Sequence, residues 1–257
     1  MTSRDDAGAE APRGRRAVLA AFLALPAGAA SAQEVFSPAQ RDAVMAILRD
    51  ALRRDPSILR DALAALEESE AAERVAAQRR ALAAEADALF RDPADPFKGN
   101  PRGDVTLVEF FDVRCGYCRA FHPTVAELLR RDRGVRVVLK DIPILGPNSV
   151  LAARALLAAQ RQNRYEALYD ALLRLRTDTP EPVIQAEARR VGLDWERLRR
   201  DMDDAAVTRR IEANLTLARR LGITGTPTTV VGDAIVVGAV DLAELERLVR
   251  AARASRD

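Results

Sequence analysis

The chain has 257 residues, which allows one or two domains, and its 40 Lys and Arg nearly balance its 38 Asp and Glu to leave a formal charge of +2. A hydrophobic content of 48% with 30% charged residues excludes wholesale disorder and a polytopic membrane protein. The small net charge gives no basic field of the kind that would indicate nucleic acid binding. Two cysteines are too few for a disulfide-rich scaffold or a four-thiolate metal site, and the 4% aromatic content favours helices over an all-β sandwich.

Residues 1–32 are predicted to be an export signal. Basic residues precede a short apolar stretch at 17–25, and the Ala-Ser-Ala at 30–32 is typical of a cleavage site. The apolar stretch is too short to span a bilayer, and a disordered tail rich in Ala and Arg is the alternative interpretation. Arg15 and Arg16 also fit the twin-arginine route, beside ordinary Sec export. Either route predicts a periplasmic protein, in an oxidising compartment where two thiols can pair.

The segment 33–92 is predicted to form an N-terminal helical arm. Ser37 is the expected N-cap of a first helix, with Pro38 in the first turn and Gln40 completing a capping box. An Asp-Pro pair at 55–56 starts a second, longer helix that is expected to run to about Phe90.

The apolar residues of this arm form a narrow seam. Three leucines recur every seven residues, at Leu52, Leu59 and Leu66. A narrow seam is typical of helix-on-helix association, and such an arm has little core of its own. We therefore expect a homo-oligomer formed through residues 36–91, with a helical hairpin folded onto its own domain as the alternative.

Residues 93–257 are predicted to form the main domain, after a boundary marked by Pro and Gly near residue 93. An apolar run at 105–111 predicts a buried strand, a helix is expected from about Gly116, and 135–140 predicts a second strand. This order indicates a βαβ unit.

The remainder of the domain is predicted to be mostly helical. Helices are expected over 147–221, one of them starting at Asp194. A hairpin of two strands at 228–231 and 234–237 is expected to follow. Asp241 is the expected N-cap of a last helix.

The two cysteines lie in a Cys115-Gly-Tyr-Cys118 motif where the first strand ends and the helix begins. Three residues span about one helical turn, so the two sulfurs can reach disulfide distance. The unpaired N–H groups and the dipole at the helix N-terminus favour a thiolate at Cys115, whereas Cys118 is expected to be more buried. The motif therefore predicts thiol–disulfide exchange, in which Cys115 attacks a substrate disulfide and Cys118 releases the mixed disulfide.

Other uses of the cysteines are less well supported. A zinc site needs four ligands, and only Cys115, Cys118 and His122 offer nitrogen or sulfur. An inert structural disulfide would close a very small loop and stabilise the fold little. Copper(I) binding by the two soft thiolates is the alternative from a different functional class. We expect no metal site and no bound cofactor, because a redox-active disulfide is itself the redox centre.

The stretch 108–118 resembles the catalytic segment of the DsbA-like branch of the thioredoxin superfamily, whose members are exported thiol–disulfide oxidoreductases. Pro123 stands where such helices commonly carry a proline, and Gly-Thr-Pro-Thr at 225–228 is similar to the cis-proline loop of the family. The motifs Asp-Pro at 92–93, Gly-Asn-Pro at 99–101, Phe-Asp at 111–112, Ile-Leu-Gly-Pro at 144–147 and Gly-Ala-Val-Asp at 238–241 resemble a suppressor-of-copper-sensitivity-C-like subgroup. Some members of that subgroup oligomerise through an N-terminal helical segment. The resemblance implies an α/β thioredoxin fold with a helical domain inserted at about 147–221, preceded by the helical arm.

The resemblance also implies a substrate-binding surface. The bond between Thr226 and Pro227 is expected to be cis and to face Cys115, so that Thr226 presents backbone groups to an extended substrate. Gly116 and Tyr117 are expected to contact the substrate as well. An ordinary trans proline at a strand entry is the alternative.

Two further residues are candidates for moving protons. Glu109, six residues before Cys115, resembles the proton-handling carboxylate of the family and would help to deprotonate Cys118. Lys140, at the end of the second strand, is its candidate partner. A salt-bridged or exposed Glu109 is the alternative.

Together these features predict an exported thiol–disulfide oxidoreductase that acts on exported client proteins with cysteines and exchanges electrons with a membrane redox partner. The Gly-Tyr dipeptide and the Thr226 before Pro227 resemble disulfide isomerases more than the strong oxidase, so we expect isomerase or reductase activity. A monomeric dithiol oxidase and a copper(I)-handling protein are the alternatives.

Overall fold

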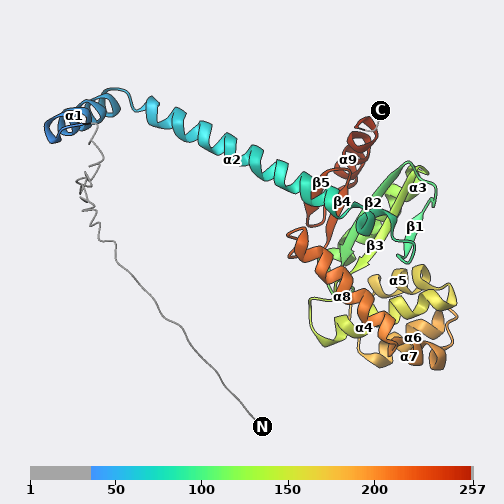
Figure 1. The fold of residues 1–257 in the computed structure, drawn as a ribbon. Coiled ribbons are helices and arrows are strands. Elements are labelled where there is room, and N and C mark those ends of the chain that lie inside the picture. The colour runs from blue at the N-terminus through green and yellow to red at the C-terminus, as the bar shows by residue number, and fades with distance from the viewer. Residues whose placement is uncertain (1–35, 256–257) are drawn as a thin grey trace, which may run out of the picture. The chain divides into compact units, whose positions relative to one another are not determined.

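The computed structural model describes residues 36–255, so the export signal predicted at 1–32 lies outside the described residues (Figure 1). The described part of the chain divides into two units, the first ending at Leu63 and the second beginning at Ala64. Within the described part of the chain, no helix combines the length and the apolar character needed to cross a bilayer.

In the first unit, helix α1 (Pro38–Arg54) and the start of helix α2 (Ser57–Ala84) form as predicted. Ser37 Oγ accepts the N–H of Gln40 at 3.3 Å, and Gln40 Oε1 accepts the N–H of Ser37 at 2.8 Å, which completes the capping box. Helix α1 buries none of its residues within the described chain. Large apolar side chains of this unit are therefore exposed: Val44, Met45, Ile47, Leu48, Ile58, Leu59 and Leu63.

The second unit is built on a sheet whose described strands run in the order β1-β3-β2-β4-β5. The strands are β1 (Phe97–Gly99), β2 (Val105–Phe111), β3 (Val135–Asp141), β4 (Thr228–Val231) and β5 (Ala234–Val237). The predicted βαβ unit is confirmed, because β2 and β3 are parallel and joined by a helix, and the β4–β5 hairpin is confirmed as well. Strand β1 was not predicted, because three residues are too few to show a period of two.

Helices make up the rest of the second unit, in agreement with the predicted fold class. They are α3 (Gly116–Arg131), α4 (Pro147–Ala159), η2 (Gln160–Gln162), α5 (Tyr165–Leu173), α6 (Glu181–Arg190), α7 (Trp195–Met202), α8 (Ala205–Arg220) and α9 (Leu242–Ala254). The segment between β3 and β4 is helical from α4 to α8. The predicted helix starts are confirmed at Asp194 in this segment and at Asp241 after β5, since their side chains accept backbone N–H groups of α7 and α9 respectively.

Both faces of the sheet are covered by helices (Figure 1). On one face, α3, α9 and the helical insertion join a core that contains Leu107 of β2 and Leu139 of β3. On the other face, α8 and the end of α2 cover Phe110 of β2 and Val138 of β3. Because successive side chains of a strand point to opposite faces, the position of a residue along β2 or β3 decides which core it joins.

The second unit begins inside α2, ahead of the boundary that was predicted near residue 93. Leu82 of α2 and Leu89 of the short π-helix η1 (Asp87–Arg91) are buried in the core that contains Phe110. Gln78 Nε2 also donates to the backbone oxygen of Asp233, at 3.1 Å. The apolar periodicity of the arm could not show where the second unit begins. A leucine that packs on the sheet of its own domain has the same spacing in the sequence as one that packs on another helix.

Candidate active site

The two cysteines lie at the junction of β2 and α3. After β2 ends at Phe111, the N–H of Cys115 donates to the backbone oxygen of Asp112 at 3.0 Å, and Cys115 becomes the N-cap of α3. The N–H groups of a first helical turn have no acceptor inside the helix, so this end of α3 carries a partial positive charge next to Cys115. Cys118 lies in the same turn, and both cysteines are free thiols. The predicted placement of the motif is confirmed.

The two thiols differ in their surroundings. Cys115 is 7% exposed, whereas Cys118 is completely buried. Burial raises the pKa of Cys118 strongly, and the charge of Glu109 raises it further, although hydrogen bonds from the backbone of Asp112 and from Thr226 oppose the shift. Cys118 therefore remains a thiol, and a weak nucleophile, until a base removes its proton.

The loop before β4 lies against Cys115. The peptide bond between Thr226 and Pro227 is cis, as predicted. Cys115 Sγ donates to the backbone oxygen of Thr226 at 3.2 Å, and Thr228 Oγ1 donates to the backbone oxygen of Gly225 at 2.8 Å. The backbone of this loop is thus held beside the thiol that would attack a substrate.

Glu109 lies in the middle of β2, close enough for its charge to raise the pKa of Cys118. It is completely buried, and Tyr169 donates its hydroxyl hydrogen to Glu109 Oε2 at 3.2 Å. Burial raises the pKa of Glu109 to about 7, against the opposing effects of the Tyr169 hydrogen bond and the charge of Lys98. A carboxyl group that titrates near neutral pH beside a buried thiol is suited to accept and return a proton.

The prediction that Lys140 is the partner of Glu109 is wrong. Lys140 Nζ contacts Asp95 and donates to the backbone oxygen of Ala88 at 2.7 Å. In the parallel pairing of β2 with β3, Glu109 is opposite Leu139, and Lys140 is opposite Phe110. Paired residues share a face, so Lys140 lies on the other face of the sheet from Glu109.

Asp112 organises the loops around the cysteines, a role that was not predicted from the sequence. Its Oδ2 accepts the N–H groups of Ile144 at 2.9 Å and Leu145 at 3.0 Å, while its Oδ1 accepts the N–H of Arg114 at 2.8 Å and the hydroxyl of Ser149 at 2.8 Å. The loop before Cys115 and the loop before α4 are therefore tied to one carboxylate. A lone carboxylate directly after a buried strand, just before the cysteine motif, was the available signal.

Exposed apolar side chains lie on the elements next to Cys115. Tyr117 in the first turn of α3 is 73% exposed, and Val237, which pairs with Thr228 beyond the cis-proline, is 72% exposed. Ile144 and Leu145, held by Asp112, are also exposed. A methyl group added at Gly116 would contact nothing within 4 Å, which leaves this side of the motif open. These residues offer an apolar surface next to the attacking thiol.

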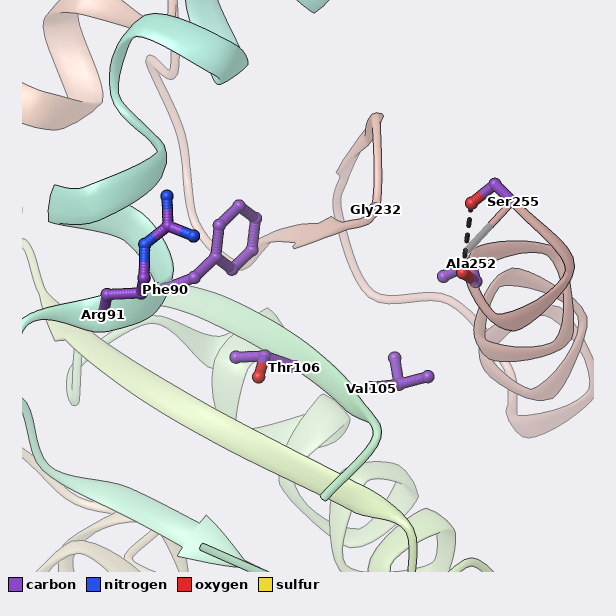
Figure 2. Close-up of a pocket in the computed structure, with 7 residues that line it drawn as sticks. All are labelled: Phe90, Arg91, Val105, Thr106, Gly232, Ala252 and Ser255. Atoms are coloured by element: carbon purple, nitrogen blue, oxygen red, sulfur yellow. Dashed lines mark hydrogen bonds between the residues drawn. The ribbon is translucent and has the colours of Figure 1, made fainter. Parts of the chain in front are cut away.

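A separate cavity lies away from the cysteines (Figure 2). Val105 and Thr106 at the start of β2 form part of its wall, whereas Cys115 follows the opposite end of that strand. The remaining walls are formed by Phe90, Arg91, Gly232, Ala252 and Ser255. Since no cysteine lines this cavity, it is distinct from the thiol site.

Comparisons with known proteins agree with this geometry. The family model described as a DSBA-like thioredoxin domain matches residues 106–250, and the one described as the copper resistance protein ScsC N-terminal domain matches residues 40–73. The solved structure of a thioredoxin-like oxidoreductase from Silicibacter pomeroyi DSS-3 is 47% identical, with a TM-score of 0.64, and covers 65% of this chain and 97% of that one. Proteus mirabilis ScsC in a transitional conformation is 32% identical, with a TM-score of 0.64, and covers 86% of this chain and 98% of that one.

Curated proteins match over a shorter share of their length. The Na(+)/H(+) antiporter NhaA 3 of Salinispora tropica is 31% identical over 169 residues, which are 63% of this chain and 26% of that protein. The chain spans about a quarter of the length of the curated relatives it matches, so the similarity concerns one part of each of them.

Proposed function

The chain belongs to the DSBA-like thioredoxin domain family and is a thiol–disulfide oxidoreductase of the DsbA and ScsC type, and from this premise we propose that it is an exported enzyme that exchanges disulfides with periplasmic client proteins and favours isomerisation or reduction. One observation carries the proposal: Cys115 caps α3 with its sulfur on the cis-proline loop, and Cys118 is buried next to Glu109.

The reaction begins at Cys115. Its thiolate attacks one sulfur of a client disulfide, a bond forms between Cys115 and that sulfur, and the electron pair of the broken bond leaves on the second client sulfur. In isomerisation, a different client thiolate then attacks the mixed disulfide, and Cys115 leaves as a thiolate with no net transfer of electrons. The partial positive charge at the start of α3 stabilises the Cys115 thiolate in both steps.

Cys118 provides the release step. Glu109 accepts the proton of Cys118, the resulting thiolate attacks Cys115, and the client sulfur leaves with the electron pair of the mixed disulfide. The client has then gained two electrons, and the enzyme holds a disulfide between Cys115 and Cys118. We propose that a membrane redox partner returns the two electrons, since the enzyme disulfide must be reduced again before Cys115 can attack another client.

Client binding is proposed to combine backbone pairing and apolar contact. An extended client segment can pair with the backbone of Thr226 as an added strand. The exposed Tyr117, Ile144, Leu145 and Val237 supply apolar surface around it. Such a surface suits unfolded or misfolded clients, which expose apolar side chains together with their cysteines.

The arm is proposed to make a homo-oligomer. The apolar side chains of α1 and the start of α2 have no cover within the described chain, and an exposed helical seam of this kind is stable when it packs on another helix. Several active sites would then face one client, which raises the effective concentration of thiols at a mispaired disulfide. This arrangement favours isomerisation.

The proposed function is tested with two chains, the mature protein and a variant that lacks residues 33–63. The deletion stops at the end of the first unit, because Leu82 and Leu89 belong to the core of the second. We expect the full chain to be oligomeric in light scattering and to refold scrambled ribonuclease, and the deletion variant to be a monomer that still reduces insulin but shuffles disulfides poorly. Equal shuffling by the two chains, or a monomeric full chain, would contradict the link and favour a monomeric oxidase.

Copper(I) handling is the second candidate function. The model that matches residues 40–73 is described for a copper resistance protein, and two adjacent thiols are ligands of the soft kind that copper(I) prefers. Copper(I) titration of the reduced chain, with a competing chelator, separates the two functions. Tight binding that disappears in Cys115→Ser, in a protein without insulin reductase activity, would favour copper handling over exchange.

A further inference from the structure

Four polar side chains from three elements contact one another on the side of the sheet that carries Glu109, and one of them, Tyr169, donates a hydrogen bond to Glu109. Tyr169 and Asp170 come from α5, His122 from α3 and Lys98 from the short edge strand β1. His122 Nε2 lies 2.8 Å from Asp170 Oδ1, and Lys98 Nζ contacts the same oxygen. Lys98 Nζ also lies 5.1 Å from the centre of the Tyr169 ring. We call these four residues the Lys98 cluster.

The Lys98 cluster leads from the buried core to the protein surface. Lys98, His122 and Tyr169 are buried, whereas the side chain of Asp170 is 23% exposed. At the outer end, Glu166 Oε1 lies 3.7 Å from Lys98 Nζ, and its side chain is more than half exposed. A buried lysine is costly without a negative partner, and Asp170 supplies one.

The hydrogen bonds of Glu109 are incomplete. Tyr169 holds Oε2, but Oε1 has no hydrogen-bond partner among the described residues. Thr229 of β4 is the cross-strand neighbour of Glu109, and its Oγ1 likewise has no partner among the residues that the structure describes. Buried polar atoms are normally paired, so an unpaired carboxylate oxygen marks the place where a proton can be held.

Several titratable groups act on Glu109 or on its neighbours from the elements packed around β2. They are Cys118, Cys115 and His122 on α3, Tyr165, Glu166, Tyr169 and Asp170 on α5, Arg174 directly after α5, Asp141 at the end of β3, and Lys98 on β1. Of the two buried lysines, Lys140 faces the other side of the sheet, so Lys98 is the buried lysine whose charge acts on Glu109.

We propose that Lys98 and Tyr169 are positioning residues that keep Glu109 charged and aligned as the base for Cys118, and that Asp170, with His122, holds Lys98 in place. The proposal rests on the proposed function, because it deepens the release step of that reaction. In that step Glu109 takes the proton of the Cys118 thiol, Cys118 forms a bond to Cys115, and the client sulfur leaves with the electron pair of the mixed disulfide.

Substitutions in the Lys98 cluster should move the titration of Glu109 in opposite directions, depending on the group that is removed. Removing the positive charge of Lys98 disfavours the charged form of Glu109, so its titration moves to higher pH. Removing the Tyr169 hydroxyl withdraws a hydrogen bond to the charged form and moves the titration in the same direction. Removing the negative charge of Asp170 leaves more of the Lys98 charge to act on Glu109 and moves the titration to lower pH. A merely structural cluster gives no such difference in sign.

The experiment uses the full mature chain and the variants Lys98→Met, Lys98→Arg, Tyr169→Phe and Asp170→Asn. Difference infrared spectroscopy follows the protonated carboxyl band of Glu109 against pH, and the band is assigned by its loss in Glu109→Gln. In parallel, the rate of glutathione release from a Cys115–glutathione mixed disulfide is measured over the same pH range. Glu166→Gln is the matched control, since its charge lies 3.7 Å from Lys98 on the solvent side.

Two pH midpoints are compared, that of the Glu109 infrared band and that of the glutathione-release rate. We expect both midpoints to rise by about one pH unit in Lys98→Met and Tyr169→Phe and to fall in Asp170→Asn. In Lys98→Arg and Glu166→Gln both should stay near the wild-type value. Unmoved midpoints, or shifts of Lys98→Met and Asp170→Asn in the same direction, would overturn the proposal. If Lys98→Met does not fold, the proposal is tested by the other two variants, in which the midpoints should rise for Tyr169→Phe and fall for Asp170→Asn. A wild-type chain that releases no glutathione would overturn the proposed function, while the infrared midpoints would still decide this inference.

Discussion

On one face of the sheet Lys140 is paired with Asp95, and Arg210 Nη1 lies 3.3 Å from the second oxygen of Asp95. On the other face Glu109 has a hydrogen bond to one oxygen only, and burial raises its pKa to about 7. Both carboxylates are buried, but Asp95 has direct contacts with two cations, whereas the hydrogen bond that Glu109 accepts comes from the neutral hydroxyl of Tyr169. We therefore expect the Lys140–Asp95 pair to stabilise the fold and the Glu109 carboxyl group to exchange a proton.

Breaking the matched pair should have the largest effect. Lys140→Met leaves Asp95 buried with only Arg210 as a cation, and we expect the free energy of unfolding to fall by about 3 kcal/mol. Urea denaturation followed by circular dichroism measures the change. The glutathione-release rate of the folded fraction should keep its pH midpoint, because Lys140 does not face Glu109. A loss below about 1 kcal/mol would show that the pair contributes no more than an exposed ion pair.

On the other face, Glu109→Gln should affect the rate. Without a base for Cys118, we expect the release of a client from the mixed disulfide to slow by about 100-fold at pH 8, and its dependence on pH to lose the midpoint near 7. Attack by Cys115 should change little. Stopped-flow measurement of the two steps separates them, and an unchanged release step would exclude Glu109 as the base.

The same substitution should stabilise the fold at higher pH. The folded-state pKa of Glu109, about 7, lies above its ordinary value of 4.5, so its favourable contribution is complete below pH 4.5 and is lost as the pH rises through 7. Glu109→Gln removes this loss, and we expect the variant to gain up to about 3 kcal/mol over the wild type above pH 7 and little at pH 4. Asp141, whose pKa burial raises to about 8, is present in both chains and cancels. Parallel stability curves of the two chains from pH 4 to 8 would contradict this account.

A smaller effect should follow from a substitution of Arg210, which lies at the partly exposed edge of the Lys140–Asp95 pair. Arg210→Ala removes the contact with Asp92 and the 3.3 Å contact with Asp95. Because Lys140 still pairs with Asp95, and Arg210 and Asp92 are partly exposed, we expect a loss of about 1 kcal/mol in the free energy of unfolding. Thermal unfolding of Arg210→Ala beside Lys140→Met compares the two directly. Equal losses would show that the cluster acts as one unit rather than as a central pair with a weaker rim.

Much of the fold followed from local patterns in the sequence. Most residues of β2 and β3 are apolar because these strands are covered on both faces, and the cysteine motif follows closely after the end of β2. The helix starts at Ser37 and Asp194 were visible because capping uses specific side chains at fixed spacing. The placement of Cys115 and Cys118 could therefore be predicted, whereas the cis bond before Pro227 was expected from the resemblance of 225–228 to the cis-proline loop of the family.

The partners of the buried charges could not be predicted in the same way. Whether Lys140 or Lys98 lies on the Glu109 side depends on the register between β2 and β3 and on the short strand β1, and a shift of one residue reverses the face. Tyr169 comes from α5, 60 residues beyond Glu109, and no local pattern connects the two. Contacts of this kind are set by tertiary packing.

The most direct test of the central claim is the identity of the cysteine that holds the client. Cys118→Ser and Cys115→Ser are each expressed with a periplasmic export signal, cells are quenched with acid, and mixed disulfides are mapped by mass spectrometry. We expect clients joined to Cys115 in Cys118→Ser and none joined to Cys118 in Cys115→Ser, because Cys118 is buried and remains protonated. Clients joined to Cys118 would contradict the assignment of Cys115 as the attacking thiol.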